Sequence, residues 1–280
     1  MLYHVTPDGP KPCGATVGRC PYKDHHEDFE SARISYELSK QTFSTKKRDR
    51  LLIPLRITPN KNKTKILESF DSLSRFYVNE QNTETAIKTQ AQCRKFLETI
   101  LDGKIPESIP KGAQHGLSMI SYSFHSHLCD AGFYAKATKK NARALAEIIG
   151  DGVALDLMAG KGYLAKSLRE AGARTIATDD NSWSLSEDIE KSDAKESLLK
   201  YGPQVTHVIL AWTPLGATLD HEILMLCRER FPHITIINIG EPPFGATGSE
   251  IFWEDAHEVN SEPILYETTS ATNDFVALVK

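Results

Sequence analysis

The carboxyl-terminal half of the chain alternates between short apolar runs and segments in which apolar residues recur at helical spacing. The apolar runs predict strands at 153–158, 174–178, 207–212 and 234–239. The helical spacing predicts helices at 141–149, 163–171, 194–201 and 219–231. Strands and helices that alternate with short connections are typical of an open, doubly wound parallel sheet. Two further strands are expected at 264–269 and 274–280, and the short polar turn between them predicts that they pair antiparallel.

The amino-terminal half has a different pattern. An apolar run predicts a strand at 51–57, and Pro54 would confine this strand to a sheet edge because proline has no N–H to donate. Helical spacing predicts helices at 30–41, 65–79 and 83–101. This half is therefore expected to form a small α+β domain ahead of the α/β sheet.

The length and the turn-forming residues together predict two domains. The chain has 280 residues, which is more than one compact domain usually contains. Two prolines and two glycines interrupt 103–112, and that composition is typical of a linker. The charge also changes there, because residues 1–110 carry 18 Lys and Arg against 14 Asp and Glu whereas the remainder is acidic. We therefore expect one domain at 1–110 and another at 111–280.

The composition is that of a globular protein, with 40% hydrophobic and 25% charged residues. The sequence contains no apolar run of about 18 residues and does not open with a basic and then apolar leader, so we expect no membrane span and a cytoplasmic location. Five scattered cysteines are too few for a disulfide framework and suggest reduced thiols.

One stretch is strongly basic. Residues 40–65 hold nine Lys and Arg and a single acid, Asp49, so their field attracts phosphates. This pattern suits contact with nucleic acid, although a solvated surface loop has the same composition.

The candidate ligand site lies where the predicted parallel strands end, since open sheets bind ligands at the carboxyl ends of their strands. The first of these strands contains Asp156 and is followed by Gly160 and Gly162, which allow the backbone to approach a ligand just before a helix begins. Asp179 ends the next strand, where a carboxylate can accept hydrogen bonds from both hydroxyls of a ribose. The pattern predicts a site for a nucleoside cofactor.

These residues resemble a known family. The segment 133–183, with ALDLMAGKGYLAKSLREAGARTIATDD, is similar to the first motifs of class I S-adenosylmethionine (SAM)-dependent methyltransferases, and the likeness continues to 280. Within that class the later motifs AWTP, IGE and TGS resemble those of an uncharacterised methyltransferase-like group. The resemblance implies a Rossmann-like sheet with a terminal antiparallel strand pair and SAM as the cofactor. It implies that the methionine part of SAM contacts Asp156, Ala159, Gly160 and Gly162, that its ribose contacts Asp179, and that its adenine contacts Asp193.

The sequence departs from that family at two positions in the glycine-rich turn. Met158 stands where the family's first glycine would be, and Lys161 replaces a small residue. The amine of Lys161 is expected either to pair with the carboxylate of the cofactor or to point to solvent.

Methyl transfer requires few catalytic residues, because the cofactor supplies the driving force and the protein mainly aligns the reacting atoms. The loop after the fourth strand is the natural place for them and reads Ala-Trp-Thr-Pro, in which Trp212 can stack on a planar substrate. Glu241 follows the fifth strand and is the best candidate for an acid or base, with a solvated Glu in a structural turn as the alternative.

The amino-terminal 29 residues contain a cluster of potential zinc ligands. These are His4, Cys13, Cys20, His25 and His26. Two thiols and two imidazoles suit tetrahedral zinc, and so short a segment with few apolar residues has little core to order it. We therefore predict Zn²⁺ bound by Cys13, Cys20, His25 and His4, while the unusual spacing leaves metal-free side chains as the alternative.

The sequence thus predicts a SAM-dependent methyltransferase that acts on nucleic acid or on a protein associated with nucleic acid. The alternative is a catalytically inactive protein that keeps the methyltransferase-like fold for binding. Met158 and the Ala-Trp-Thr-Pro loop favour the alternative.

Overall fold

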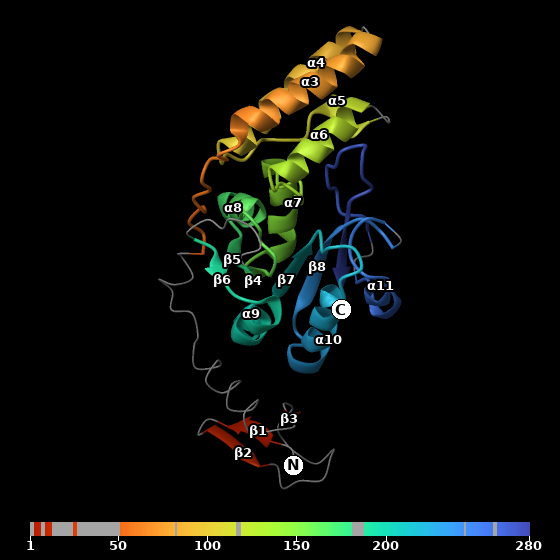
Figure 1. The fold of residues 1–280 in the computed structure, drawn as a ribbon. Coiled ribbons are helices and arrows are strands. Elements are labelled where there is room, and N and C mark those ends of the chain that lie inside the picture. The colour runs from red at the N-terminus through yellow and green to blue at the C-terminus, as the bar shows by residue number, and fades with distance from the viewer. Residues whose placement is uncertain are drawn as a thin grey trace.

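A six-stranded mixed sheet organises the carboxyl-terminal part of the protein (Figure 1). The structure is a computed structural model that describes residues 3–6, 9–12, 25–26, 51–81, 83–115, 119–180, 188–243, 245–259 and 262–280. The strand order is β6-β5-β4-β7-β8-β9, in which every neighbouring pair is parallel except β8 and β9. The strands are β4 (Val153–Asp156), β5 (Arg174–Asp179), β6 (Glu190–Lys191), β7 (His207–Ala211), β8 (Thr235–Gly240) and β9 (Phe275–Val279).

Helices cover both faces of this sheet, as the alternating sequence pattern predicts. They are α7 (Lys139–Ile149), α8 (Tyr163–Glu170), α9 (Ala194–Tyr201), α10 (Leu219–Arg230) and α11 (Glu250–Asp255). Successive strand residues point to opposite faces, so Ala154 and Ile209 pack with α7 and α8 whereas Leu155 and Val208 pack with α9 and α10. The prediction of an α/β fold is therefore confirmed.

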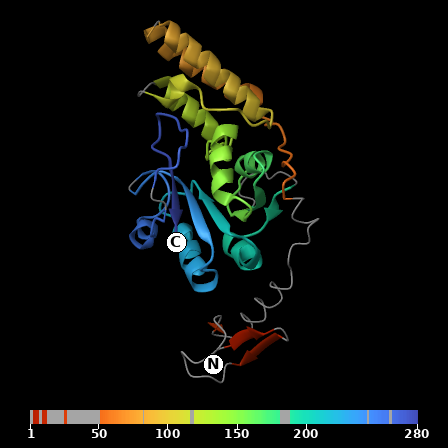
Figure 2. The same ribbon diagram turned by 180° about the vertical axis from the view of Figure 1, so that it is seen from behind.

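A layer of helices precedes the sheet in the chain. It consists of α3 (Lys63–Gln81), α4 (Glu84–Leu101), the short α5 (Lys111–Gln114) and α6 (Met119–Asp130). The helical pair α3 and α4 confirms the helices predicted at 65–79 and 83–101. Figures 1 and 2 place this pair at one end of the molecule, with α6 and α7 between it and the sheet.

Aromatic rings join this helical layer to the sheet. Phe96 of α4 meets Phe124 of α6 and Phe133 edge to face, and Phe133 in turn meets Tyr163 of α8. The segment 103–112 is irregular up to α5, as expected of a linker, but its Ile105 and Ile109 are buried in the same hydrophobic cluster. One cluster thus spans the predicted boundary, and the division into two domains stays a prediction.

The strand predicted at 51–57 is wrong. Leu55 and Ile57 are buried, but the segment runs as irregular chain beside α8 and β5. Its backbone groups are used elsewhere: the carbonyl of Ile53 accepts from the guanidinium of Arg169 at 3.1 Å, and the N–H of Arg56 donates to Asp188 at 3.0 Å. Pro54 removes a further donor, so no strand ladder forms.

The predicted antiparallel pair of 264–269 and 274–280 is also wrong in part. The second segment forms β9, but β9 pairs with β8, and 264–269 is irregular. The side chain of Asn141 takes both backbone groups of Glu267, accepting from its N–H and donating to its carbonyl, each at 2.8 Å. The backbone of Glu267 is therefore unavailable to a neighbouring strand.

The amino-terminal part contains a three-stranded antiparallel sheet made of β1 (Tyr3–Thr6), β2 (Gly9–Pro12) and β3 (His25–His26). The helix predicted at 30–41 and residues 40–50 of the basic stretch, with five of its nine basic residues, lie outside the described residues. Within the described parts of the chain, no helix is long and apolar enough to cross a membrane.

Candidate functional site

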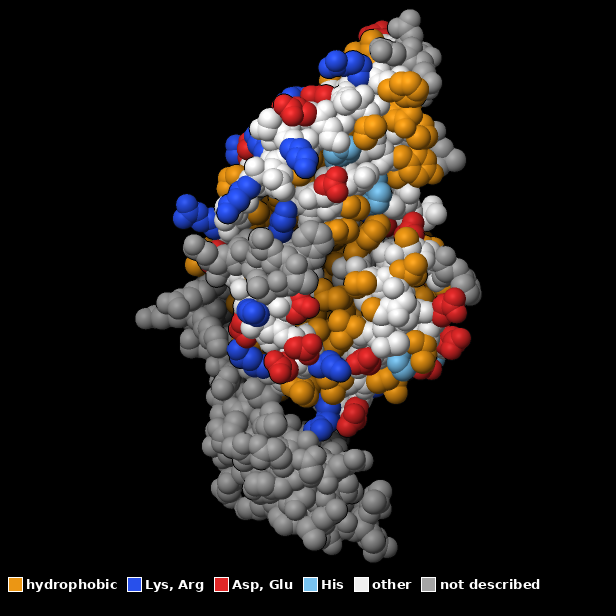
Figure 3. Space-filling view, in the orientation of Figure 1, with side chains coloured by type: hydrophobic (Ala, Val, Ile, Leu, Met, Phe, Trp, Pro, Cys, Tyr) orange, Lys and Arg blue, Asp and Glu red, His pale blue; other side chains and the backbone are white. Residues whose placement is uncertain are grey.

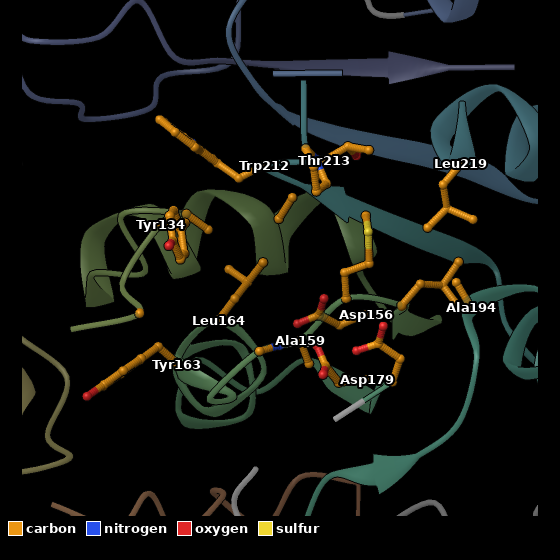
Figure 4. Close-up of a pocket in the computed structure, with 18 of the residues that line it drawn as sticks. Tyr134, Asp156, Ala159, Tyr163, Leu164, Asp179, Ala194, Trp212, Thr213 and Leu219 are labelled. Carbon is orange, nitrogen blue, oxygen red and sulfur yellow. Dashed lines mark hydrogen bonds between the residues drawn. The ribbon is translucent and has the colours of Figure 1, made fainter. Parts of the chain in front are cut away.

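A pocket of about 440 Å³ opens where β4, β5 and β7 end, at the carboxyl edge of the sheet. Its wall combines the turn after β4, the ends of β5 and β7, the start of α9 and the segment between α6 and α7. Figure 4 shows side chains from these elements converging on it, and Figure 3 shows hydrophobic side chains lining a hollow in the middle of the same face. The structure therefore has a cavity at the place where the sequence predicts a ligand site.

The turn between β4 and α8 depends on two glycines. Gly160 has φ +54° and Gly162 has φ +84°, values that L side chains rarely adopt. A Cβ on Gly162 would also lie 2.8 Å from the Cδ1 of Ile189. The N–H of Gly160 donates to the Oδ2 of Asp179 at 2.9 Å, so the turn holds this carboxylate at the pocket wall. The two glycines thus shape this turn, and their predicted role at a cofactor stays a prediction.

Asp156 and Asp179 face one another across this end of the pocket (Figure 4). Asp156 is only 1% exposed, and its Oδ2 has no hydrogen-bond partner among the described residues. Burial, and after it the nearby charge of Asp179, raises the pKa of Asp156 to about 7, against the opposing effect of one backbone hydrogen bond from Met158. A buried carboxylate with one unpartnered oxygen is suited to a cationic or hydrogen-bond-donating ligand.

Two more carboxylates line the same end of the pocket. Asp180 follows Asp179 at the end of β5, and Asp193 precedes α9. Asp193 is also the N-cap of α9, because its Oδ1 accepts from the N–H groups of Lys195 and Glu196 at 2.9 and 3.3 Å. The structure thus gives Asp193 a capping role, and its predicted contact with an adenine stays a prediction.

Lys161 adopts neither of its two expected positions. Its Nζ donates to the carbonyl of Ala131 at 3.0 Å, at the end of α6. The side chain reaches this carbonyl past Gly132, where a Cβ would lie 3.0 Å from the Cδ of Lys161. Burial lowers the pKa of Lys161. The lysine therefore ties the glycine-rich turn to α6, while Met158 and Ala159 line the pocket.

The two predicted catalytic residues lie in different places. Trp212 follows β7 and lines the pocket. Glu241 does not line it: its Oε2 accepts from the N–H of Ala246 at 2.5 Å and its Oε1 from the N–H of Asn273 at 3.1 Å. These bonds tie together the loops after β8 and before β9, and a catalytic role for Glu241 stays a prediction.

Only two of the four predicted zinc ligands, His4 and His25, belong to the described residues. Cys13 and Cys20 lie outside the described residues. The backbone register of β1 and β3 places His4 opposite His25 and Tyr3 opposite His26. Within the described residues no group of three or more His, Cys, Asp or Glu side chains is arranged to hold a metal ion. Zinc bound by Cys13, Cys20, His25 and His4 stays a prediction.

Sequence reasoning missed one wall of the pocket. This wall is the segment 132–137 between α6 and α7, which contributes Tyr134, and the Nζ of its Lys136 lies over the ring of Trp212. The local sequence FYAKAT contains no glycine and no carboxylate, the signals that located the acidic end of the pocket, so nothing in it indicated a binding surface. Comparison of the chain with protein-family models and with curated proteins finds no match.

Proposed function

We propose that the protein binds SAM in this pocket and transfers its methyl group, as a methyltransferase with a Rossmann-like sheet. The observation that carries the proposal is the acidic end of the pocket, where the turn at Gly160 holds Asp179 beside the buried Asp156. Carboxylates at the ends of two adjacent parallel strands can take a ribose and an amino group at once. The unpartnered Oδ2 of Asp156 suits the ammonium group of the methionine part.

The negative charge of the pocket favours the binding of SAM over that of a dinucleotide. Four carboxylates line it, those of Asp156, Asp179, Asp180 and Asp193, and the described residues of its wall include no Lys or Arg. A pyrophosphate would carry negative charge into this field without a counter-charge, which is unfavourable in a partly buried site. SAM carries a sulfonium and an ammonium against one carboxylate, so the same field favours it.

The chain's own residues would bind and align the reactants. SAM supplies a methyl group on a sulfonium: the acceptor's lone pair forms the new bond to carbon as the carbon–sulfur bond breaks, and that electron pair stays on sulfur. Asp179 would orient the ribose and Asp156 the ammonium group. Trp212 and Tyr134, both half-buried, stand at the opposite end of the pocket and would place the acceptor. Alignment of this kind is a large part of the catalysis such a displacement needs.

Thermal unfolding with two ligands tests the choice of cofactor. A ligand at about 100 times its Kd stabilises the folded state by about 2.7 kcal/mol, which raises the Tm of a chain of this size by several degrees. We expect SAM and S-adenosylhomocysteine to raise the Tm and NAD⁺ to leave it unchanged. A rise with NAD⁺ and none with SAM would refute the assignment.

The second candidate is a protein that binds SAM without transferring its methyl group. Glu241, the expected acid or base, has both carboxylate oxygens engaged by backbone N–H groups. An acceptor whose reactive atom carries no removable proton would need no base, so this observation favours the inactive alternative only for acceptors that must lose a proton.

Contact with nucleic acid rests on the basic stretch at 40–65. If Lys46, Lys47, Arg48 and Arg50 contact phosphates, affinity for duplex DNA should fall with salt with a slope of about −0.9 per phosphate neutralised. Changing all four to Ser should flatten this slope in fluorescence-anisotropy titrations. A variant with the wild-type slope would remove these residues from any such interface.

A further inference from the structure

Backbone strain is concentrated at two residues beside the pocket. Lys136 and Trp212 have φ of +45° and +54°, and in the described part of the chain no other residue except glycine has a positive φ. Such conformations are costly for L residues and persist only where the surroundings enforce them. The two residues touch: the Nζ of Lys136 lies 4.0 Å from the centroid of the Trp212 ring. The coincidence indicates that the position of this indole is enforced.

A buried ion pair provides the enforcement. The side chain of Lys136 is fully buried, and its Nζ lies 2.5 Å from the Oδ2 of Asp274, whose side chain is also fully buried. Asp274 immediately precedes β9 and also accepts from the hydroxyl of Thr268 at 3.2 Å. Burial lowers the pKa of Lys136, and the carboxylate of Asp274 opposes this shift. Buried ion pairs are weak sources of stability but can fix a single arrangement of the groups around them.

The side chains that line the ring end of the pocket and those packed against its indole carry no net charge, although the charge of Asp130 acts on Tyr134 and Cys129 from outside the pocket wall. His125 of α6 lies with its ring centroid 5.5 Å from that of Trp212, and burial together with the charge of Lys136 lowers its pKa to about 4. Cys129 contacts His125 at 3.6 Å, and burial raises the pKa of its thiol. The charge of Glu241 also acts on Lys136 and His125, but this carboxylate is held by backbone N–H groups outside the pocket. At neutral pH His125 and Cys129 are both uncharged.

The pocket therefore has two chemically distinct ends. Its charged residues, the four aspartates, belong to the ends of β4 and β5 and the start of α9. At the other end the rings of Tyr134 and Trp212 form a corner, with centroids 5.8 Å apart and planes inclined by 41° (Figure 4). Aromatic side chains bind planar groups by stacking or edge-to-face contact. An anion placed here would lose its hydration without meeting a counter-charge, and the ammonium of Lys136, which already lies over the indole, opposes the binding of a second cation.

We propose that this corner is the methyl-acceptor subsite and that the accepting atom belongs to an uncharged planar ring, with Lys136 and Asp274 as positioning residues that fix the indole of Trp212. The inference rests on the proposed function, because the acidic end is taken to hold SAM. It excludes the ammonium of a lysine side chain and the guanidinium of an arginine as acceptors. The shared chemistry fits a nucleobase as well as a free heteroaromatic molecule.

Three planar probes that differ mainly in charge test the subsite. Benzamide is neutral, benzamidinium is a cation and benzoate is an anion of nearly the same shape. Each is titrated by NMR into the full chain saturated with S-adenosylhomocysteine. We expect benzamide to bind at least about fivefold more tightly than either ion, because only the ions lose hydration without a counter-charge. Equal or tighter binding of benzamidinium or benzoate would overturn the proposal.

Variants locate the probe. Trp212→Ala should weaken benzamide binding by about tenfold, since one stacking surface is lost, and Tyr134→Ala is the second variant should Trp212→Ala fail to fold. Trp253→Ala is the matched control, because Trp253 stacks on Phe275 and does not line the pocket. Benzamide affinity equal to that of the wild type in both Trp212→Ala and Tyr134→Ala would contradict the subsite.

The positioning role requires a variant that leaves no buried charge without a partner. The double variant K136M/D274N removes both charges and nearly keeps the side-chain volumes. We expect it to weaken benzamide about three- to tenfold while S-adenosylhomocysteine affinity stays within about threefold. Unchanged benzamide affinity would remove Lys136 and Asp274 from this role.

Two controls are needed. One distinguishes failure of the proposed function from failure of the subsite, and the other distinguishes a nucleobase from a free molecule as the acceptor. If the wild-type protein does not bind S-adenosylhomocysteine, the proposed function itself is refuted. Benzamide that still binds at Trp212 in the absence of S-adenosylhomocysteine would support the subsite independently. Competition by a single-stranded oligonucleotide would assign the ring to a nucleobase, and benzamide binding that the oligonucleotide does not reduce would assign it to a free molecule. Both of these results agree with an uncharged planar acceptor.

Discussion

Replacing Asp156 by Asn should make the protein more stable at pH 8 and weaken its binding of SAM. Burial and the charge of Asp179 raise the pKa of Asp156 to about 7, against about 3.9 in an unfolded chain. For an acid with a raised pKa, the folded state loses stability as pH rises from about 4 to 7, and above 7 the loss is of the order of 4 kcal/mol. Asn keeps the shape without the charge, so we expect a gain of about 2 to 3 kcal/mol in urea unfolding at pH 8.

The pH dependence provides the control for this prediction. The stability difference between the variant and the wild type should shrink as pH falls from 7 towards 4, because Asp156 is then protonated in the wild type as well. Asp151→Asn, a change at an exposed carboxylate in the turn before β4, should show no such dependence. SAM affinity in Asp156→Asn should fall at least about tenfold, the cost of losing a charged hydrogen-bond partner. Lower stability than the wild type at pH 8 would show that the carboxylate is not a destabilising buried charge.

Asp179→Ala should weaken SAM binding by about 1.5 to 3 kcal/mol, or about 10- to 150-fold. The substitution removes the predicted ribose contact and also the acceptor of the N–H of Gly160, which holds the turn. Because the charge of Asp179 contributes to the raised pKa of Asp156, the midpoint for SAM binding should also move to lower pH. Affinity measured by calorimetry from pH 5.5 to 8.5 reports both effects.

Two further variants make the Asp179 result interpretable. Asp179→Asn keeps an acceptor for Gly160 without the charge and should bind SAM with an affinity between those of the wild type and Asp179→Ala. Asp151→Ala is the control for removing an exposed carboxylate near the opposite edge of the sheet. Wild-type affinity in Asp179→Ala would remove this residue from the cofactor site.

The sheet and the acidic end of the pocket were predictable because local sequence determines them. Buried parallel strands are continuous apolar runs, and the turn after β4 needs positive φ at Gly160 and Gly162, which glycine supplies best. Asp156 and Asp179 follow from the same pattern, since the carboxyl ends of adjacent parallel strands meet at one edge.

The ring end of the pocket could not be predicted because it depends on contacts between distant segments. Lys136 is neutralised by Asp274, which is 138 positions later, and no periodic pattern marks a buried lysine. The segment 264–269 looks like a strand by its apolar and β-branched residues, but the side chain of Asn141 takes the backbone groups of Glu267. Tertiary hydrogen bonds override local propensity at such positions.

Calorimetric titration of the full chain with SAM at pH 7, in two buffers of different ionisation enthalpy, tests the central claim most directly. We predict one SAM per chain and the release of up to about half a proton on binding, because the cation converts the half-protonated Asp156 to its ionised form. Asp156→Asn should bind more weakly and release less. A titration that shows no binding, or binding without a difference between the buffers, would contradict the account of this pocket.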